Sequence, residues 1–153
     1  MSASNPWMDA LLESALELAE TTLGCEVTVD APPESVSGID LTNSLVALVG
    51  ERTSVQIGIA ADDRGCQSLA KLLLGADEEL TDSDVSDAMG EIANIIGGGV
   101  KKRLAGEFGG MRLGLPVVLM GHLELTRKQR VAQRSILFGE TAARLVVVRN
   151  TSE

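Results

Sequence analysis

The stretch TDSDVSDAMGEIANIIGGGVKKRL, which runs from Thr81 to Leu104, decides how we interpret this chain. At about 100° per residue its apolar side chains fall in one arc or on its flanks. They are Val85, Ala88, Met89, Ile92, Ile95, Ile96 and Val100. Thr81 with an acidic residue three positions later is a typical helix N-cap, and acidic residues favour the positive helix end. The stretch therefore predicts an amphipathic helix ending near Leu104.

A polar stripe lies opposite the apolar arc. It contains Asp87, Glu91, Asn94 and Gly98, with Lys101 close by. Any surface helix has a polar face, but asparagine and glycine are poor helix formers, and a glycine costs up to about 1 kcal/mol relative to alanine. The three glycines at 97–99 thus need a reason. Gly98 could leave room for another backbone, and close packing within the chain explains the glycines equally well.

The remaining sequence predicts helices and paired strands in mixed order. Expected are a helix from Pro6 ended by Gly24, a strand at 26–30, a loop at 31–38, a hairpin of strands 44–49 and 55–59, a helix through 69–74 ended by Gly75, strands 111–115 and 117–120 around Pro116, and a hairpin of strands 135–138 and 144–148. This order predicts an α+β fold, in which a largely antiparallel sheet packs with two long helices and one shorter helix. We expect one domain, residues 5–150.

Composition excludes several classes of function. The chain of 153 residues has a net charge of −9, which argues against nucleic acid as a partner. His122 is the only histidine, so a zinc site built on several imidazoles is excluded. Cys25 and Cys66 are expected to be inert thiols without a disulfide. No apolar segment is long enough to insert into a membrane, and no basic leader is present, so we expect a cytoplasmic protein.

Charge clusters and glycine runs elsewhere have ordinary explanations. The basic residues at 101–103 and at 127–134 (Arg127, Lys128, Arg130 and Arg134) are typical of solvated surface, with a docking patch for an acidic partner as the alternative. The acidic runs 62–63 and 77–79 lack the spacing of a calcium loop and suit a helix start and a loop. Residues 106–110 do not open a helix with the sequence of a phosphate loop.

The polar stripe resembles a known signature. Asp87-x3-Glu91-x2-Asn94 followed by Pro116 looks like the D/S-x3-E-x2-N…P pattern of the CheC/CheX/FliY phosphatases of bacterial chemotaxis. The likeness spans residues 5–121 and includes the segments 5–7, 23–24, 36–38 and 73–75. CheC-type proteins carry the signature on two helices. The first helix here offers only Glu13 with Leu16 and Glu17 with Glu20, so one site per chain fits CheX better.

The resemblance implies hydrolysis of the aspartyl-phosphate on a CheY-like response regulator. Asn94 would hold the attacking water, since an amide can accept and donate hydrogen bonds without a charge that repels phosphate. Glu91 would bind the receiver's lysine, and Asp87 and Gly98 would be partner contacts. Mg²⁺ is expected on the receiver, with no cofactor or metal bound by this chain.

Two further expectations concern assembly and function class. The resemblance suggests a homodimer, and exposed strand edges could pair two subunits. The alternative function is a non-catalytic module that binds a receiver or a flagellar-switch protein. A metabolic enzyme with a buried pocket has little support, because the sequence lacks a cofactor fingerprint.

Overall fold

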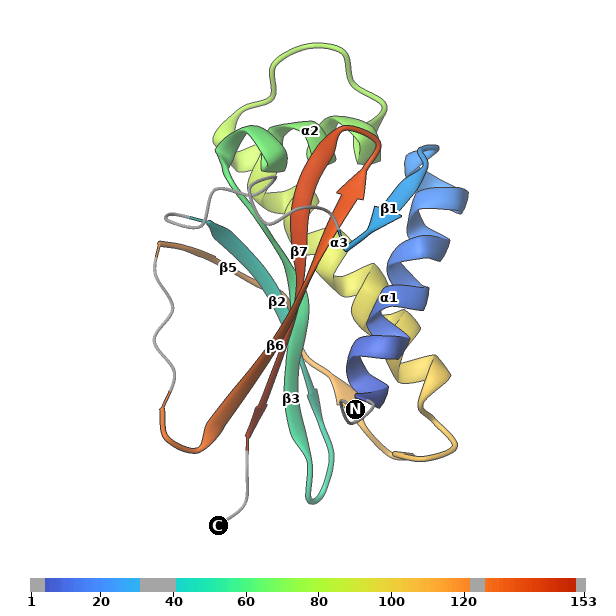
Figure 1. The fold of residues 1–153 in the computed structure, drawn as a ribbon. Coiled ribbons are helices and arrows are strands. Elements are labelled where there is room, and N and C mark those ends of the chain that lie inside the picture. The colour runs from blue at the N-terminus through green and yellow to red at the C-terminus, as the bar shows by residue number, and fades with distance from the viewer. Residues whose placement is uncertain (1–4, 31–40, 122–125, 151–153) are drawn as a thin grey trace.

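A computed structural model describes residues 5–30, 41–121 and 126–150. Its centre is a seven-stranded sheet, and the helices α1 and α3 lie side by side along one face of that sheet, while α2 lies near one end (Figure 1). Every strand pair in the described part of the chain is antiparallel. This arrangement confirms the predicted α+β class.

The helices begin and end at the residues that the sequence supplies as caps. They are α1 (Pro6–Leu18), continued by the π-helical turn η1 (Ala19–Leu23), then α2 (Asp63–Leu74) and α3 (Asp82–Arg103). Asn5 Oδ1 accepts hydrogen bonds from the first N–H groups of α1, and Asp62 Oδ1 accepts from the Gly65 N–H of α2 at 2.7 Å. Gly24 and Gly75 end their helices at φ 68° and 64°, which glycine adopts without strain.

The strands follow the order β1-β6-β7-β3-β2-β4, and β5 pairs with β2 beside β4. Their bounds are β1 (Val27–Val29), β2 (Thr42–Val49), β3 (Ser54–Ala61), β4 (Arg112–Leu113), β5 (Val117–Met120), β6 (Gln129–Phe138) and β7 (Thr141–Asn150). The strands β4 and β5 therefore lie at the edge of the sheet, next to α3.

The core lies between the sheet and the helices. Alternate residues of the central strands point into it, among them Val46 and Leu48 of β2, Ile57 and Ile59 of β3, and Leu145 and Val147 of β7. The other face of the sheet carries a smaller buried cluster around Leu45 and Val146. Helix α3 thus packs on one face of the sheet.

Several predicted boundaries were wrong. Strand β6 begins at Gln129 rather than at residue 135, because its polar first half is held by pairing with β7. The strand predicted at 111–115 is reduced to β4. The Gly114 N–H still donates a hydrogen bond to the Ala47 carbonyl oxygen of β2 at 2.8 Å, but Pro116 has no N–H to donate. The predicted loop 31–38, the segment 36–38 of the resemblance and His122 lie outside the described residues.

Candidate functional site

Helix α3 carries the signature and is capped by its own sequence. Thr81 Oγ1 accepts a hydrogen bond from the Asp84 N–H at 3.1 Å, as the N-cap pattern predicts. Asp82 and Asp84 lie in the first turn, and the basic residues 101–103 lie in the last. Both placements favour the helix dipole. These end effects help a helix of 22 residues to form despite the three glycines within it.

The two faces of α3 are those that the periodicity predicts. Met89, Ile92, Ile96 and Val100 are at most 1% exposed and face the core. Asp87 and Glu91 are exposed, and Asn94 and Gly98 are partly exposed. The polar stripe therefore faces outward.

Two buried serines hold α3 in place. Ser44 Oγ on β2 donates a hydrogen bond to the Met89 carbonyl oxygen at 2.7 Å. Ser14 Oγ on α1 donates one to the Ile96 carbonyl oxygen at 2.9 Å. One bond lies just before Glu91 and the other just after Asn94, so the sheet and α1 together fix the helix around these two residues.

The three consecutive glycines have different surroundings. A Cβ on Gly97 would overlap Cγ1 of Val46 on β2, and a Cβ on Gly99 would overlap Oγ of Ser14 on α1. Close packing within the chain therefore explains these two. A Cβ on Gly98 would meet no atom within 4 Å. The fold itself gives no reason for a glycine at this position.

A groove brings the signature residues together. Asp87, Glu91 and Asn94 line it from α3 and Pro116 from the edge of the sheet, and its volume is about 490 Å³. Pro116 packs over Gly90, where a Cβ would lie 3.5 Å from Cγ of Pro116, an ordinary van der Waals contact. Gly98 is not part of the groove wall.

Sequence reasoning missed four other residues of the groove wall. They are Ser86, Gly90, Leu115 and Val118. A glycine inside a strongly amphipathic helix was the one available signal, and it marks where Pro116 packs. The other three line the groove only because β5 lies beside α3.

The side chains of Glu91 and Asn94 are free to bind a partner. Within the described part of the chain, neither makes a hydrogen bond or an ion pair. Nor do the described residues contain a group of three or more His, Cys, Asp or Glu side chains arranged to hold a metal ion. What the groove offers is one carboxylate and one amide on a rigid helix.

The acidic residues of α1 are engaged differently. Arg103 of α3 donates a hydrogen bond to Glu17 at 2.5 Å and lies 3.9 Å from Glu13. That bond lowers the pKa of Glu17. The carboxylates of α1 therefore help to join it to α3, which agrees with a single candidate site on this chain.

Both cysteines are free thiols, as predicted. Burial raises the pKa of Cys66 to about 11, with a further contribution from the Asp63 carboxylate. Burial also raises the pKa of Cys25. Because the thiolate is the reactive form, neither cysteine has the character of a nucleophile.

We expect Cys66 to react with iodoacetamide at pH 8 more than about 100-fold more slowly in the native protein than in the unfolded protein. A thiol with a pKa of about 11 has only about one thousandth of its population as thiolate at that pH. Mass spectrometry of the labelled peptides measures both cysteines in one sample, and Cys25, which is less buried, serves as the internal control. Equal rates before and after unfolding would contradict the expectation.

Comparison with known proteins agrees with the geometry. The family model described as chemotaxis phosphatase CheX matches residues 42–139. No curated protein matches the chain. In the described residues, no helix has the length and apolarity needed to cross a membrane.

Three solved structures have the same fold. The chemotaxis protein CheX from Vibrio vulnificus superposes with a TM-score of 0.74 at 21% identity, over 98% of this chain and all (100%) of that one. CheX in the CheX–CheY–BeF₃–Mg²⁺ complex from Borrelia burgdorferi gives 0.65 at 15% identity, over 96% of each chain. The FliM middle domain from Vibrio alginolyticus gives 0.64 at 11% identity, over 94% of this chain and 90% of that one.

The family model covers well over half of the chain, including β2, the signature helix and Pro116. At identities this low the superpositions establish the fold alone, and they agree with the family match over nearly the full chain. The chain therefore belongs to the CheX family of chemotaxis phosphatases.

Proposed function

We propose that this chain accelerates hydrolysis of the aspartyl-phosphate on a CheY-like receiver protein. The observation that carries the proposal is that Glu91 and Asn94 share one groove with Pro116, and that their side chains have no partner in the described part of the chain. A polar pair held on a rigid helix and left unpaired is suited to a partner's active site. Membership of a family of chemotaxis phosphatases supports the reaction class.

The reaction needs a well-placed water molecule. The water oxygen attacks phosphorus, the bond from phosphorus to the aspartyl oxygen breaks, and the carboxylate leaves as inorganic phosphate forms. Positioning and electrostatics supply most of the catalysis in phosphoryl transfer. The carbonyl oxygen of Asn94 would accept a hydrogen bond from the water, and its NH₂ group would donate to a nearby oxygen. The amide is neutral, so it does not repel the phosphoryl group.

The two carboxylates of the stripe would have different roles. Glu91 would accept a charge-assisted hydrogen bond from the receiver's lysine and so hold α3 in register. The receiver would supply the phosphoaspartate, this lysine and Mg²⁺. Asp87, which lies exposed at the groove edge, would contact the partner away from the phosphoryl group, since two negative groups repel each other.

Gly98 would be a point of close approach. It lies one turn beyond Asn94 and is partly exposed, and the space where its side chain would be is empty of this chain's atoms. A glycine in a helix is destabilising, so its presence without an internal packing reason supports contact with a partner's backbone at this position.

The test is the rate of phosphate release from a panel of phosphorylated CheY-type receivers in Mg²⁺, with and without the protein. Faster release from at least one receiver is the expected result. The FliM middle domain has the same fold, and this similarity favours a second candidate function, that of a binding module. Tight binding of a receiver without faster phosphate release would support that alternative and contradict catalysis.

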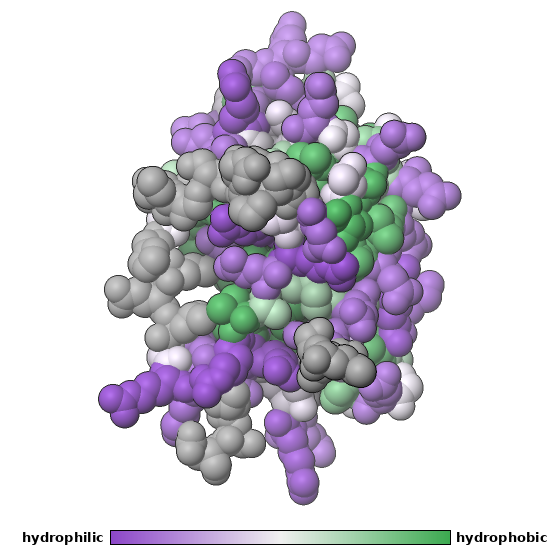
Figure 2. Space-filling model, viewed as in Figure 1, coloured by the Kyte–Doolittle hydropathy of each residue, from purple (hydrophilic) through white to green (hydrophobic). Residues whose placement is uncertain are grey.

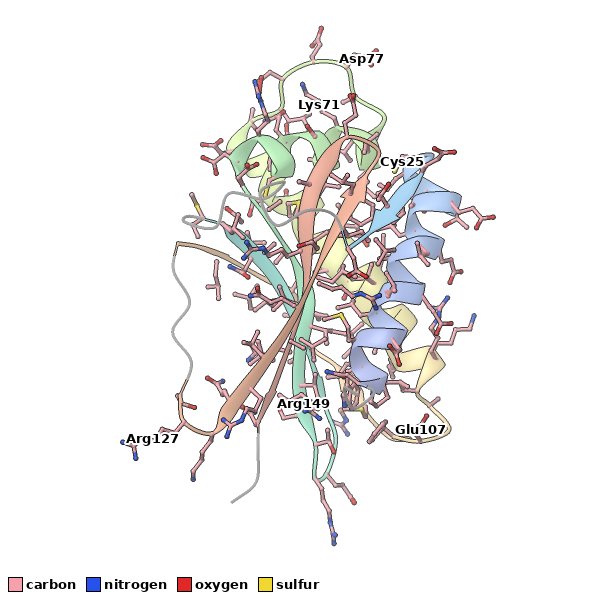
Figure 3. All side chains as sticks on the ribbon, viewed as in Figure 1. Cys25, Lys71, Asp77, Glu107, Arg127 and Arg149 are labelled. Atoms are coloured by element: carbon pink, nitrogen blue, oxygen red, sulfur yellow. The ribbon has the colours of Figure 1, made fainter. Side chains whose placement is uncertain are left out.

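We expect Glu91→Ala to raise the receiver concentration at half-maximal rate by about tenfold or more. A lost hydrogen bond to a charged group costs about 1.5–3 kcal/mol. The measurement is the dependence of the rate of phosphate release on receiver concentration, and the rate itself should also fall. Glu107→Ala is the matched control, because Glu107 is an exposed carboxylate on the loop beyond α3 (Figure 3). If both variants matched the unchanged protein, Glu91 would have no role in docking.

A further inference from the structure

A second cleft continues the groove toward α2. It lies between α2, the first half of α3 and the strands β2 and β5, and its volume is about 620 Å³. Ser86 and Val118 line both the groove and this cleft. We call it the α2–α3 cleft. Because the two depressions share part of their wall, a protein docked at the groove lies next to this cleft.

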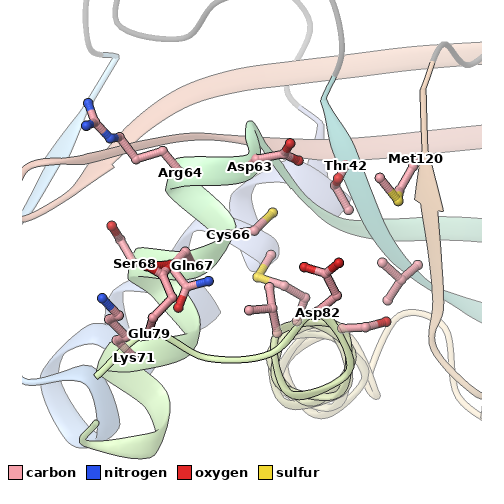
Figure 4. A pocket seen from close by; sticks show the side chains of 14 residues that line it. Thr42, Asp63, Arg64, Cys66, Gln67, Ser68, Lys71, Glu79, Asp82 and Met120 are labelled. Atoms are coloured by element: carbon pink, nitrogen blue, oxygen red, sulfur yellow. The ribbon is translucent and has the colours of Figure 1, made fainter. Parts of the chain in front are cut away.

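The α2–α3 cleft has apolar walls and an acidic mouth. Val85 and Met120 provide apolar surface, whereas Met89, which also borders the cleft, is fully buried. Figure 4 shows Asp63 of α2 and Asp82 of α3 with their carboxylates turned toward the same space. Among the described residues that line the cleft, the cations are Arg64 and Lys71, and both point away from that space (Figure 4).

The carboxylates of Asp63 and Asp82 have no cationic partner among the described residues. Within residues 5–30, 41–121 and 126–150, Asp63 and Asp82 make no ion pair. The two acidic groups repel each other, and a cation placed between them would be attracted by both.

The surface around the α2–α3 cleft is also negatively charged. Residues 62–91 contain nine carboxylates but only two basic side chains, Arg64 and Lys71. This end of the molecule, formed by α2 and the loop after it, is largely hydrophilic on the face seen in Figure 2. Basic side chains such as Arg127 and Arg149 lie at the opposite end of the molecule (Figure 3). The cleft therefore attracts a basic rather than an acidic partner surface.

Catalytic and metal-binding roles for the cleft have no support. The Cys66 thiol lines the cleft but stays protonated near neutral pH, because burial and the Asp63 carboxylate raise its pKa to about 11. A protonated thiol is a poor nucleophile and a poor metal ligand. No group of three metal-ligating side chains is arranged here among the described residues.

We infer that the α2–α3 cleft receives a lysine or arginine side chain of the same receiver that docks at the groove; this inference rests on the proposed function. The aliphatic stem of such a side chain packs on Val85 and the exposed Met120. Its cationic head lies between Asp63 and Asp82, where charge-assisted hydrogen bonds form. The receiver is thus held at two points, the groove and the cleft.

The first test compares two double variants of equal charge. Asp63→Asn with Asp82→Asn removes the acidic mouth, and Asp77→Asn with Glu78→Gln removes two carboxylates from the loop outside the cleft wall. The probe is a CheY-type receiver activated with beryllofluoride and Mg²⁺. We expect the cleft variant to bind about tenfold more weakly, with a reduced salt dependence, and the loop variant to stay within about twofold of the unchanged protein. Equal affinities for the two variants would overturn the inference.

The second test needs no substitution. In methyl NMR of the unchanged protein, the exposed Met120 reports on the α2–α3 cleft, and Met8 and Met111, which are buried elsewhere, are internal controls. On binding of the activated receiver, the resonance of Met120 should shift and those of the controls should not. Binding without a shift of Met120 would overturn the inference.

Failure of the inference and failure of the proposed function give different results. At saturating receiver the cleft variant should release phosphate at the unchanged maximal rate, since Asn94 is intact. A receiver that binds through the cleft without faster phosphate release would leave the inference standing and contradict the proposed catalysis. Faster phosphate release, together with unchanged affinity of the cleft variant for the receiver, would support the proposed catalysis and contradict the inference about the cleft.

Discussion

Replacing Asn94 with alanine is expected to lower the maximal rate of receiver dephosphorylation at least about 100-fold. The amide would hold the attacking water in line with the breaking bond, and misplacement of a reacting group alone can cost about that factor. Affinity for the receiver should fall little, because the water contributes chiefly in the transition state. The measurement is phosphate release at saturating phosphorylated receiver in Mg²⁺.

The fold should tolerate this substitution. The Asn94 side chain is partly exposed and makes no hydrogen bond to any described residue of the chain. Alanine is also the better helix former, so the free energy of unfolding should be unchanged or slightly higher. A slow Asn94→Ala variant would therefore report on chemistry rather than on unfolding.

Lys101→Ala is the control for the Asn94 substitution. Lys101 is exposed on the same helix, next to the stripe but outside the groove wall. The maximal rate of dephosphorylation by Lys101→Ala should stay within a few-fold of that of the unchanged protein, whereas Asn94→Ala should be much slower. Undiminished phosphate release by Asn94→Ala would remove the proposed mechanism.

Alanine at each of the three glycines of α3 is expected to change stability in opposite directions. Gly97→Ala should lower the free energy of unfolding by about 1–3 kcal/mol, because the new methyl group overlaps Val46 on β2. Gly99→Ala should have a similar cost, since it displaces the Ser14 hydroxyl that binds the Ile96 carbonyl. Gly98→Ala should raise the free energy of unfolding by up to about 1 kcal/mol.

Urea denaturation of the three variants measures these differences. The same samples, titrated with beryllofluoride-activated receiver, test the second part of the prediction. Gly98→Ala should bind the receiver more weakly although its fold is more stable, because its methyl group enters the space that a partner backbone would use. A destabilised Gly98→Ala would contradict the empty space around that position, and full affinity would contradict the proposed contact.

Much of the fold could be predicted from the sequence because its signals are local. The cap residues Asn5 and Thr81 and the terminating glycines Gly24 and Gly75 act within a few positions of where they stand. Strand β6 could not be bounded in this way. Its first half is polar and mostly exposed, and only pairing with β7 makes it a strand. That information is tertiary and does not appear in a local pattern.

The candidate site was predictable to a similar extent. Periodicity placed Asp87, Glu91 and Asn94 on one face, and resemblance supplied Pro116. Periodicity could not tell which of the glycines packs against β2, against α1 or against nothing, since that depends on elements distant in sequence. The α2–α3 cleft was invisible for the same reason, as it exists only where α2 and β5 flank the first half of α3.

The hydrogen bonds from Ser14 and Ser44 to α3 have a consequence for how soon the reaction can follow an encounter with the receiver. Ser44 of the sheet donates a hydrogen bond to the Met89 carbonyl oxygen, and Ser14 of α1 donates one to the Ile96 carbonyl oxygen. These two carbonyls are seven residues, or about two helical turns, apart. The helix cannot roll about its axis without breaking both bonds and leaving buried groups unsatisfied. Under the proposed function, the stripe is thus already oriented before an encounter, and no rearrangement of α3 delays the reaction. The lifetime of the receiver's signal would then depend on how often the two proteins meet and on the hydrolysis step, and not on a movement of α3.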